Sequence, residues 1–169
     1  GDKTFPVNGT MDKLKLNDAI GVVYIGDGTL GEGVVYETLN FISKKEIPMI
    51  VVCENNKYAQ STPIEYNLSG SIKARAIAFD IEYRESSTFG YDLEILNEAQ
   101  LSIDWVRKNK KPIFHLVNTY RLKAHSKGDD DRDVSEIGNY EKLDFLEILK
   151  KKDPDYYNRE NLKIEKEIL

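Results

Sequence analysis

The chain has 169 residues, 40% of them apolar, which is enough for one domain with a sizeable core. Its formal net charge of −5 argues against nucleic acid or an anionic membrane as the main partner, since both need a basic surface. No stretch approaches the roughly 20 apolar residues of a membrane span, so we expect a soluble protein. The single cysteine, Cys53, can form no internal disulfide, which favours a reducing compartment such as the cytoplasm.

Strand-like and helix-like patterns alternate along the sequence. Continuous apolar runs predict strands buried on both faces, and apolar residues three or four apart predict helices. This alternation predicts an α/β fold with a doubly wound, mostly parallel sheet and flanking helices. In chain order we expect a strand at 19–27, a helix at 34–45, a strand at 47–54, a helix at 72–79 capped by Ser71, a strand at 81–86, a helix at 93–109 capped by Asp92, a strand at 112–120 and an amphipathic helix at 140–155 ended by Pro154.

Residues 1–169 are expected to form a single domain. No strand is predicted before residue 19, although a doubly wound domain normally has elements ahead of its first phosphate-binding turn. We therefore expect that the chain is trimmed at its N-terminus, and the helical pattern at its C-terminus also stops before it is complete. The polar segment 120–138 follows a strand, where ligands bind in open α/β sheets, and is predicted to be a loop of the binding site.

The glycines of "IGDGTLGEG" follow the first predicted strand and spell G-x-G-x-x-G, a pattern typical of dinucleotide-binding turns. Glu54, 26 residues after Gly28, stands near where a ribose-binding acid would lie. Against this interpretation, Asp27 would face the pyrophosphate, and two like charges at ~4 Å repel by about 4 kcal/mol. A divalent cation between them reverses the sign, so Asp27 suggests a Mg²⁺ site that binds a diphosphate.

A second metal ligand is expected at the end of the neighbouring strand. Asn55 and Asn56 stand there, and their amide oxygens suit a hard cation. Alternatively, the pair belongs to an Asn-rich turn, because asparagine tolerates left-handed backbone. Asp27 lies 29 residues before Asn56, and the combination favours the metal site.

G-D-G followed at this interval by N-N resembles the thiamine diphosphate motif. The surrounding "GDGTLGEGVVYETLNF" and "IPMIVVCENNKYAQSTP" resemble the α chain of 2-oxo acid dehydrogenase E1 components, a family of pyruvate, branched-chain 2-oxo acid and acetoin enzymes. The likeness runs from about residue 19 to 137 and implies the diphosphate-binding domain of the thiamine diphosphate fold. It also implies Mg²⁺ held by the side chains of Asp27 and Asn56 and the Tyr58 carbonyl. The cofactor would be bound by Gly26, Asp27, Gly28, Thr29, Asn56, Tyr58, Gln60, Arg121 and His125.

"TYRLKAHSKGDDDRD" resembles the family segment that reaches the cofactor phosphates and the reaction centre. By this resemblance, Arg121 neutralises diphosphate charge, since a guanidinium suits phosphate oxygens. His125 would be the catalytic residue, contacting the diphosphate or the bound intermediate and assisting acyl transfer to lipoyl. Ser126 matches a position that is phosphorylated in mitochondrial relatives. By contrast, His115 lies within a predicted strand and is interpreted as a core histidine, and Cys53 as a small buried hydrophobe.

Two departures from the family pattern affect the site. Gln60 replaces a bulkier apolar residue that props the cofactor's bent conformation, which indicates a more polar pocket or support from another chain. In the family, the glutamate that contacts the aminopyrimidine belongs to a separate pyrimidine-binding domain, and we expect that no residue of this sequence supplies it. The resemblance therefore implies an E1 β chain or a fused pyrimidine-binding domain as a partner, and an isolated chain with little activity.

The resulting hypothesis is thiamine diphosphate- and Mg²⁺-dependent oxidative decarboxylation of a small 2-oxo acid, with acyl transfer to lipoamide on an E2 protein. The resemblance implies an α2β2 heterotetramer or a fused dimer in the cytoplasm, without nucleic acid or membrane partners. Two alternatives stay open. One is a transketolase-like enzyme or decarboxylase with the same cofactor anchor, and the other is an NAD-binding oxidoreductase domain.

Overall fold

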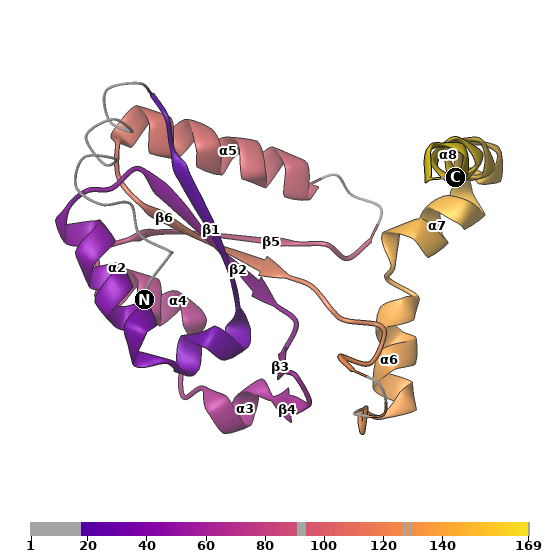
Figure 1. The fold of residues 1–169 in the computed structure, drawn as a ribbon, viewed down its shortest axis with the longest axis horizontal. Helices are drawn as coiled ribbons and strands as arrows, with labels where there is room; N and C mark the ends of the chain where they lie inside the picture. The colour runs from indigo at the N-terminus through magenta and orange to yellow at the C-terminus, as the bar shows by residue number, and fades with distance from the viewer. Residues whose placement is uncertain (1–17, 91–93, 127, 129, 169) are drawn as a thin grey trace.

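The computed structural model describes residues 18–90, 94–126, 128 and 130–168, and its centre is a parallel sheet of four strands (Figure 1). The order is β1-β2-β6-β5, with the registers Gly21↔Met49, Ile50↔Ile113 and Glu82↔Ile113 at its start. The parallel sheet confirms the predicted fold class, although the predicted capping by Asp92 falls outside the described residues. The strands are β1 (Gly21–Gly26), β2 (Met49–Asn55), β5 (Glu82–Ser87) and β6 (Ile113–Asn118).

Helices cover the two faces of the sheet unequally. Helices α2 (Gly33–Lys44) and α4 (Ile72–Ala78) lie on one face, and α5 (Glu94–Asn109) lies on the other (Figure 1). The predicted cap of α4 is confirmed, because the Ser71 hydroxyl accepts a hydrogen bond from the N–H of Ala74 at 3.4 Å. The larger core lies on the α2 and α4 side, and a smaller one lies beneath α5 around Ile50, Val106 and Ile113.

The prediction that the first strand is buried on both faces is wrong. Strand β1 alternates between half-buried and exposed residues, and Tyr24 is 69% exposed. Val22 and Tyr24 pair with Ile50 and Val52, so they share the face that α5 covers. Because β1 is the outermost strand, these two side chains lie outside the smaller core beneath α5.

The segments after β2 and β6 lie at the carboxyl end of the sheet. The strands β3 (Tyr58–Ala59) and β4 (Thr62–Pro63) form a hairpin, and the short helix α3 (Ile64–Asn67) follows. The predicted loop 120–138 ends earlier than expected, since α6 (Val134–Glu141) begins at its Asp133 cap.

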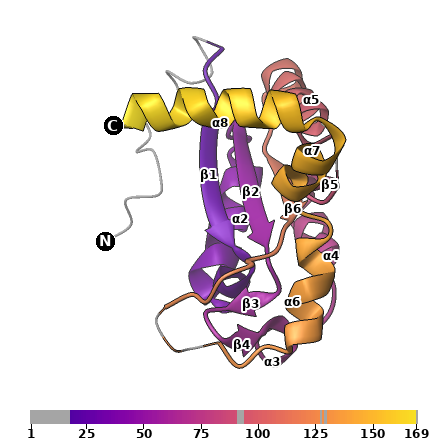
Figure 2. The same cartoon turned by 90° about the vertical axis from the view of Figure 1, so that its right-hand side faces the viewer.

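The single helix predicted at 140–155 is instead divided between two helices. Asp144 caps α7 (Phe145–Lys152), and its carboxylate accepts from the N–H of Glu147 at 3.0 Å. Pro154 begins α8 (Pro154–Ile168) rather than ending a helix, because a proline fits the first helical turn, where its missing N–H costs nothing. Helices α7 and α8 extend away from the sheet (Figures 1 and 2). Among the helices that the structure describes, none is long and apolar enough to cross a membrane.

Candidate functional site: a carboxylate at the end of the first strand

Asp27 follows β1 directly and is buried, with only 1% of its surface exposed. It begins the 3₁₀ turn η1 (Asp27–Gly31), which connects β1 to the segment before α2. Burial raises the pKa of the Asp27 carboxyl, and the backbone N–H groups around it, including those of Asn56 and Lys57, lower that pKa in part. Its Oδ2 atom is buried without a hydrogen-bond partner among the residues that the structure describes. A buried carboxylate with one unpaired oxygen is suited to a cation.

The loop after β2 approaches Asp27, as the sequence analysis expected for Asn56. The amide oxygen of Asn56 accepts a hydrogen bond from the N–H of Tyr58 at 2.9 Å, which closes a turn over Lys57. Lys57 has φ of 67°, and Gln60 has φ of 55°, so both have left-handed backbone. The turn predicted at Asn55 and Asn56 is present, because the Asn56 side chain closes it. The same turn lies beside Asp27, as the alternative prediction of a metal site requires.

Gly28 lies where η1 meets β3 most closely. A Cβ built on Gly28 would come within 2.6 Å of the Ala59 Cβ, so a larger residue would force the two segments apart. The side chain of Asn67 donates to the Gly28 carbonyl at 2.8 Å and holds η1 from the other side. The N–H of Gly28 interacts with the Asp27 carboxyl and lowers the pKa of that group.

Arg121 reaches the hairpin from the loop after β6. Its Nη2 donates to the Gln60 carbonyl at 2.7 Å, and its Nε is buried with no partner in the described part of the chain. Arg121 lines a pocket of about 300 Å³ together with Tyr58, Ser61, Pro63, Asp130, Asp131, Arg132 and Asp133. His125 is exposed and is not among these lining residues, so the structure brings Arg121, but not His125, to the pocket beside Tyr58.

Arg132 stabilises the loop that carries Arg121 through hydrogen bonds to its backbone. Its side chain is 4% exposed and pairs with Asp130 through two hydrogen bonds of 2.6 and 2.7 Å. The guanidinium also donates to the carbonyls of Arg121 and Lys123 and lies over the rings of Tyr58 and Tyr120. Asp130 raises the pKa of Arg132, and Arg132 lowers the pKa of the Asp130 carboxyl, so both remain charged.

Helix α6 is attached to the same loop through Glu136. The hydroxyls of Tyr58 and Tyr120 both donate to the Glu136 carboxylate, at distances between 2.9 and 3.0 Å. Burial and the hydrogen bond to Glu136 raise the pKa of Tyr58 to about 12, so its hydroxyl keeps its proton at neutral pH. Tyr120 stacks on Tyr140 with ring centroids 3.8 Å apart, and this packs α6 against the end of β6.

The residues at this end of the sheet fit a divalent cation and a diphosphate. In the described residues no three His, Cys, Asp or Glu side chains gather as a metal site, so a cation at Asp27 must take neutral oxygens as well. Amide and carbonyl oxygens are present at Asn56 and Tyr58, and Mg²⁺ accepts such ligands together with phosphate and water. The buried Oδ2 of Asp27, which is unpaired within the described ranges, is the observation that favours this fit.

The sequence pattern of the family described as "Dehydrogenase E1 component" matches residues 8–167. This chain belongs to that family. The α subunit of the pyruvate dehydrogenase E1 component from Zymomonas mobilis is 35% identical over 122 residues, which cover 71% of this chain and 34% of that protein. The α subunit of 2-oxoisovalerate dehydrogenase from Bacillus subtilis is 31% identical over 144 residues, covering 84% of this chain and 41% of that protein.

These matches confirm the resemblance to E1 α chains on which the sequence analysis relied. The chain spans between about a third and a half of the length of the curated relatives it matches. Among solved structures, a transketolase from Campylobacter jejuni is similar in fold, with a TM-score of 0.52 and 21% identity over 64% of this chain and 17% of that one. At this level of identity the likeness concerns the fold alone.

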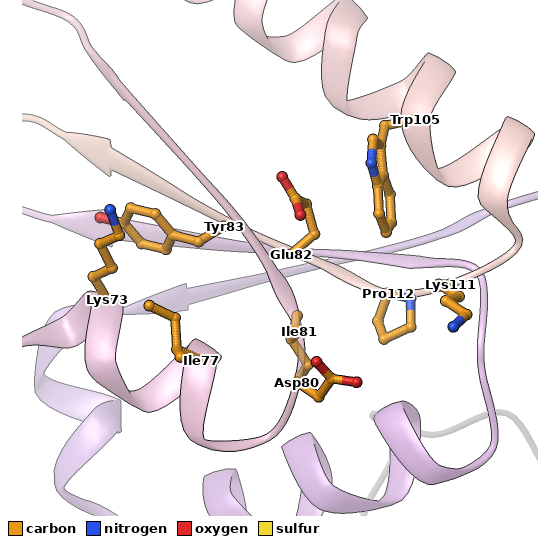
Figure 3. Close-up of a pocket in the computed structure, with 9 residues that line it drawn as sticks. All are labelled: Lys73, Ile77, Asp80, Ile81, Glu82, Tyr83, Trp105, Lys111 and Pro112. Carbon is orange, nitrogen blue, oxygen red and sulfur yellow. The ribbon is translucent and has the colours of Figure 1, made fainter.

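The opposite end of the sheet carries a larger pocket, of about 440 Å³ (Figure 3). It lies where β5 and β6 begin, between α4 and α5, and Figure 3 shows Ile77 and Trp105 on either side of Ile81 and Glu82. Its lining mixes apolar side chains with two lysines and two acids. Ligands of open α/β sheets bind at the carboxyl ends of the strands, so size alone does not make this pocket the functional site.

Cys53 and His115, which were both predicted to be core residues, are buried in the sheet. Cys53 is fully buried, and burial, with the charge of Asp27 nearby, raises its pKa to about 12. His115 is buried between two serines, with Nε2 2.8 Å from the Ser86 hydroxyl and Nδ1 3.0 Å from the Ser102 hydroxyl. Asn118 and Glu136 were not expected at the site, because their partners come from distant segments. Arg132 was not expected there either, since its contact with the Tyr58 ring forms only on folding.

Proposed function

We propose that this chain is the α chain of a thiamine diphosphate- and Mg²⁺-dependent 2-oxo acid dehydrogenase E1 component, and that residues 1–169 form its diphosphate-binding domain. The observation that carries the proposal is the buried Asp27 carboxyl, which follows β1 and has one unpaired oxygen among the described residues. Membership of the dehydrogenase E1 component family supports it independently. An NAD site would instead place that carboxylate against a pyrophosphate with nothing to offset the repulsion.

In this proposal, Asp27, the Asn56 side chain and the Tyr58 carbonyl hold Mg²⁺, which bridges to the diphosphate. Gly26, Gly28 and Thr29 belong to the turn that accommodates the diphosphate, and the close contact of Gly28 with Ala59 supports a requirement for glycine there. Gln60 lies along the cofactor, and its exposed side chain and left-handed backbone support a polar lining at this point.

Segment 120–138 is proposed to be the cofactor loop. Arg121 neutralises diphosphate charge, and its buried Nε, which has no partner among the residues that the structure describes, supports a role in binding an anion. His125 is the proposed catalytic residue, which contacts the bound substrate and assists acyl transfer. Because His125 is exposed and outside the pocket that Arg121 lines, this role requires the loop to rearrange or a partner chain to complete the site.

The substrate is a small 2-oxo acid, and the names of the relatives, which include pyruvate and 2-oxoisovalerate dehydrogenase subunits, support this class. When bound, thiamine diphosphate supplies the carbanionic carbon and the electron sink that decarboxylation requires. The acyl group is then transferred to lipoamide on an E2 partner. An E1 β chain or fused domain completes the site in an α2β2 or fused dimer, and the buried thiol of Cys53 is compatible with a cytoplasmic location.

Isothermal titration calorimetry on the full-length protein with its partner chain tests the proposal. We expect thiamine diphosphate to bind in the presence of Mg²⁺ and to lose its affinity when EDTA removes the metal. The Asp27→Ala variant should lose binding under both conditions, while Ser102→Ala, which alters a buried site away from Asp27, should bind like the wild type. Binding of NAD that is indifferent to EDTA, or unchanged binding by Asp27→Ala, would contradict the proposal.

A further inference from the structure

One face of the sheet continues past its apolar core into a row of polar side chains. Ile25, Cys53 and Leu116 are paired neighbours in the register of β1, β2 and β6, and they belong to the core beneath α2 and α4. Because side chains alternate between faces along a strand, Asn55 and Asn118, two positions after Cys53 and Leu116, lie on the same face. Asp27 stands two positions after Ile25, in the turn η1 that follows β1, so polar residues stand at the carboxyl ends of three adjacent strands.

Hydrogen bonds join this row to Glu85 on β5. The Tyr83 hydroxyl donates to Glu85 Oε2 at 2.7 Å, and Asn118 Nδ2 donates to Glu85 Oε1 at 2.7 Å. Asn55 Nδ2 then donates to Asn118 Oδ1 at 2.9 Å. Backbone bonds fix the same strand ends, since the N–H of Thr119 donates to the Asn55 carbonyl at 3.0 Å.

The charge of Glu85 determines the direction of this chain of hydrogen bonds. An ionised carboxylate only accepts hydrogen bonds, so Asn118 must turn its NH₂ group toward Glu85 and its oxygen toward Asn55. Asn55 must in turn direct its NH₂ group toward Asn118. Since Asn118 lies on the β6 side of β2, the oxygen of Asn55 is left for the β1 side, where Asp27 lies.

Two buried acceptors therefore stand at the neighbouring ends of β1 and β2 without a donor in the described part of the chain. Asn55 Oδ1 and Asp27 Oδ2 are both buried, and neither has a hydrogen-bond partner within the described ranges. The amide oxygen of Asn56 differs, because it accepts the N–H of Tyr58. Each unsatisfied buried acceptor costs roughly 1–3 kcal/mol, and a shared cation would satisfy both.

We propose that Asn55 is a further oxygen donor for the divalent cation at Asp27, and that Glu85 and Asn118 are positioning residues that orient its amide. This inference rests on the proposed function, because it assumes a cation at Asp27. The inference extends the cation site from the end of β1 to all four strands of the sheet. In it, the exposed carboxylate of Glu85 on β5 determines whether the oxygen or the NH₂ group of the half-buried Asn55 faces the metal.

Mn²⁺ binding, measured by electron paramagnetic resonance on the full-length enzyme with saturating thiamine diphosphate, tests the proposal without an activity assay. We expect Asn55→Leu to weaken Mn²⁺ binding about tenfold or more. Glu85→Gln should weaken Mn²⁺ binding by several fold. A glutamine can donate a hydrogen bond to Asn118, which allows both asparagine amides to turn over and directs the NH₂ group of Asn55 toward the metal. Tyr83→Phe is the matched control, since it removes a bond to Glu85 but leaves Glu85 charged, and should bind Mn²⁺ within twofold of the wild type.

Wild-type affinity in both Asn55→Leu and Glu85→Gln would overturn the inference, as would equal losses in Glu85→Gln and Tyr83→Phe. If Asn55→Leu fails to fold, the near-isosteric Glu85→Gln still decides the result. The Asp27→Ala variant separates the two proposals. If Asp27→Ala abolishes Mn²⁺ binding while the Asn55 and Glu85 variants bind normally, only this inference is wrong. If Asp27→Ala binds Mn²⁺ like the wild type, the proposed function is wrong as well.

Discussion

Two clusters of buried polar side chains lie in the same sheet and differ in how well their hydrogen bonds are satisfied. His115 on β6 has both ring nitrogens bonded to serine hydroxyls, so this cluster is closed. At the end of β1 and β2, Asp27 and Asn55 each keep a buried oxygen with no donor among the described residues, so this cluster is open. A closed cluster contributes to stability, whereas an open one is stabilised by a ligand, and this difference distinguishes structural from functional polar burial.

Burial also shifts the two ionisable groups in opposite directions. It raises the pKa of the Asp27 carboxyl and lowers the pKa of His115, because it disfavours the charged form of each. His115 can remain neutral at physiological pH without a functional cost. Asp27 must be charged to bind a cation, so the site holds a carboxylate that the protein alone stabilises poorly.

The largest effect is expected from Asp27→Asn, which keeps the shape of the open cluster and removes its charge. Cation binding should fall more than about a hundredfold, since even substitutions outside the ligand shell cost 10–100-fold. The cation-free protein should become about 1 kcal/mol more stable, because an amide can donate to Asn55 Oδ1. Calorimetry with Mg²⁺ and thermal unfolding in EDTA measure the two effects.

The sign of the stability change follows from the raised pKa of Asp27. The native state holds this proton to higher pH than the unfolded chain, so the stabilising contribution exists at low pH and is lost as the pH rises through the native pKa. At neutral pH only the cost of the buried charge remains. A variant that binds Mg²⁺ normally, or that is less stable than the wild type in EDTA, would contradict the description of this cluster as open.

A substitution in the closed cluster should lower the stability of the protein and leave Mg²⁺ affinity unchanged. Ser102→Ala leaves the buried Nδ1 of His115 without its partner, and we expect it to cost about 1–3 kcal/mol of unfolding free energy. Mg²⁺ affinity should stay within twofold of the wild type. Urea denaturation and calorimetry on the same preparation measure both quantities, and a loss of Mg²⁺ binding without loss of stability would reverse the assignment of the two clusters.

The closed cluster should also give a pH dependence of stability. The pKa of His115 is lowered in the native state, so the unfolded chain binds more protons and stability falls as the pH drops below about 6.5. Arg84 and Glu98 face this histidine with opposite effects on its pKa. The free energy of unfolding between pH 5 and 8 should lose this dependence in His115→Gln. The exposed His125 is the other histidine of the chain, and His125→Gln should retain it.

The smallest effect is expected at Glu136, which attaches α6 to Tyr58 and Tyr120 rather than to the open cluster itself. Glu136→Gln keeps an acceptor for the hydroxyls of Tyr58 and Tyr120 but removes its charge. Hydrogen bonds to charged groups are about twice as strong as neutral ones, so we expect Mg²⁺ affinity to fall by about threefold or less. The pKa of Tyr58 should fall from about 12, which ultraviolet titration can follow. An unchanged Tyr58 titration would show that the charge of Glu136 does not act on Tyr58.

Several elements were predictable because the signal is local. The apolar run of β2, the Ser71 cap and the burial of Cys53 and His115 each follow from residues close in sequence. The exposure of β1 was not predictable, because an apolar strand has the same pattern whether or not a helix covers it. The break at residues 142–144 was missed because apolar residues continue across it, although Asp144 is a recognisable cap.

The sequence by itself determined the family, the parallel α/β fold and the candidate ligands Asp27 and Asn56, since glycines, an aspartate and asparagines at a fixed interval are readable in one dimension. The tertiary structure decided which buried oxygens lack a donor among the described residues, that the Asn55 amide donates to Asn118, and that Arg121, but not His125, reaches the pocket beside Tyr58. These properties depend on the register of neighbouring strands and on partners distant in sequence, such as Asn55 and Asn118, which are 63 residues apart. Hydrogen-bond satisfaction is a property of the folded chain, because each acceptor is paired or left open by segments that only folding brings together.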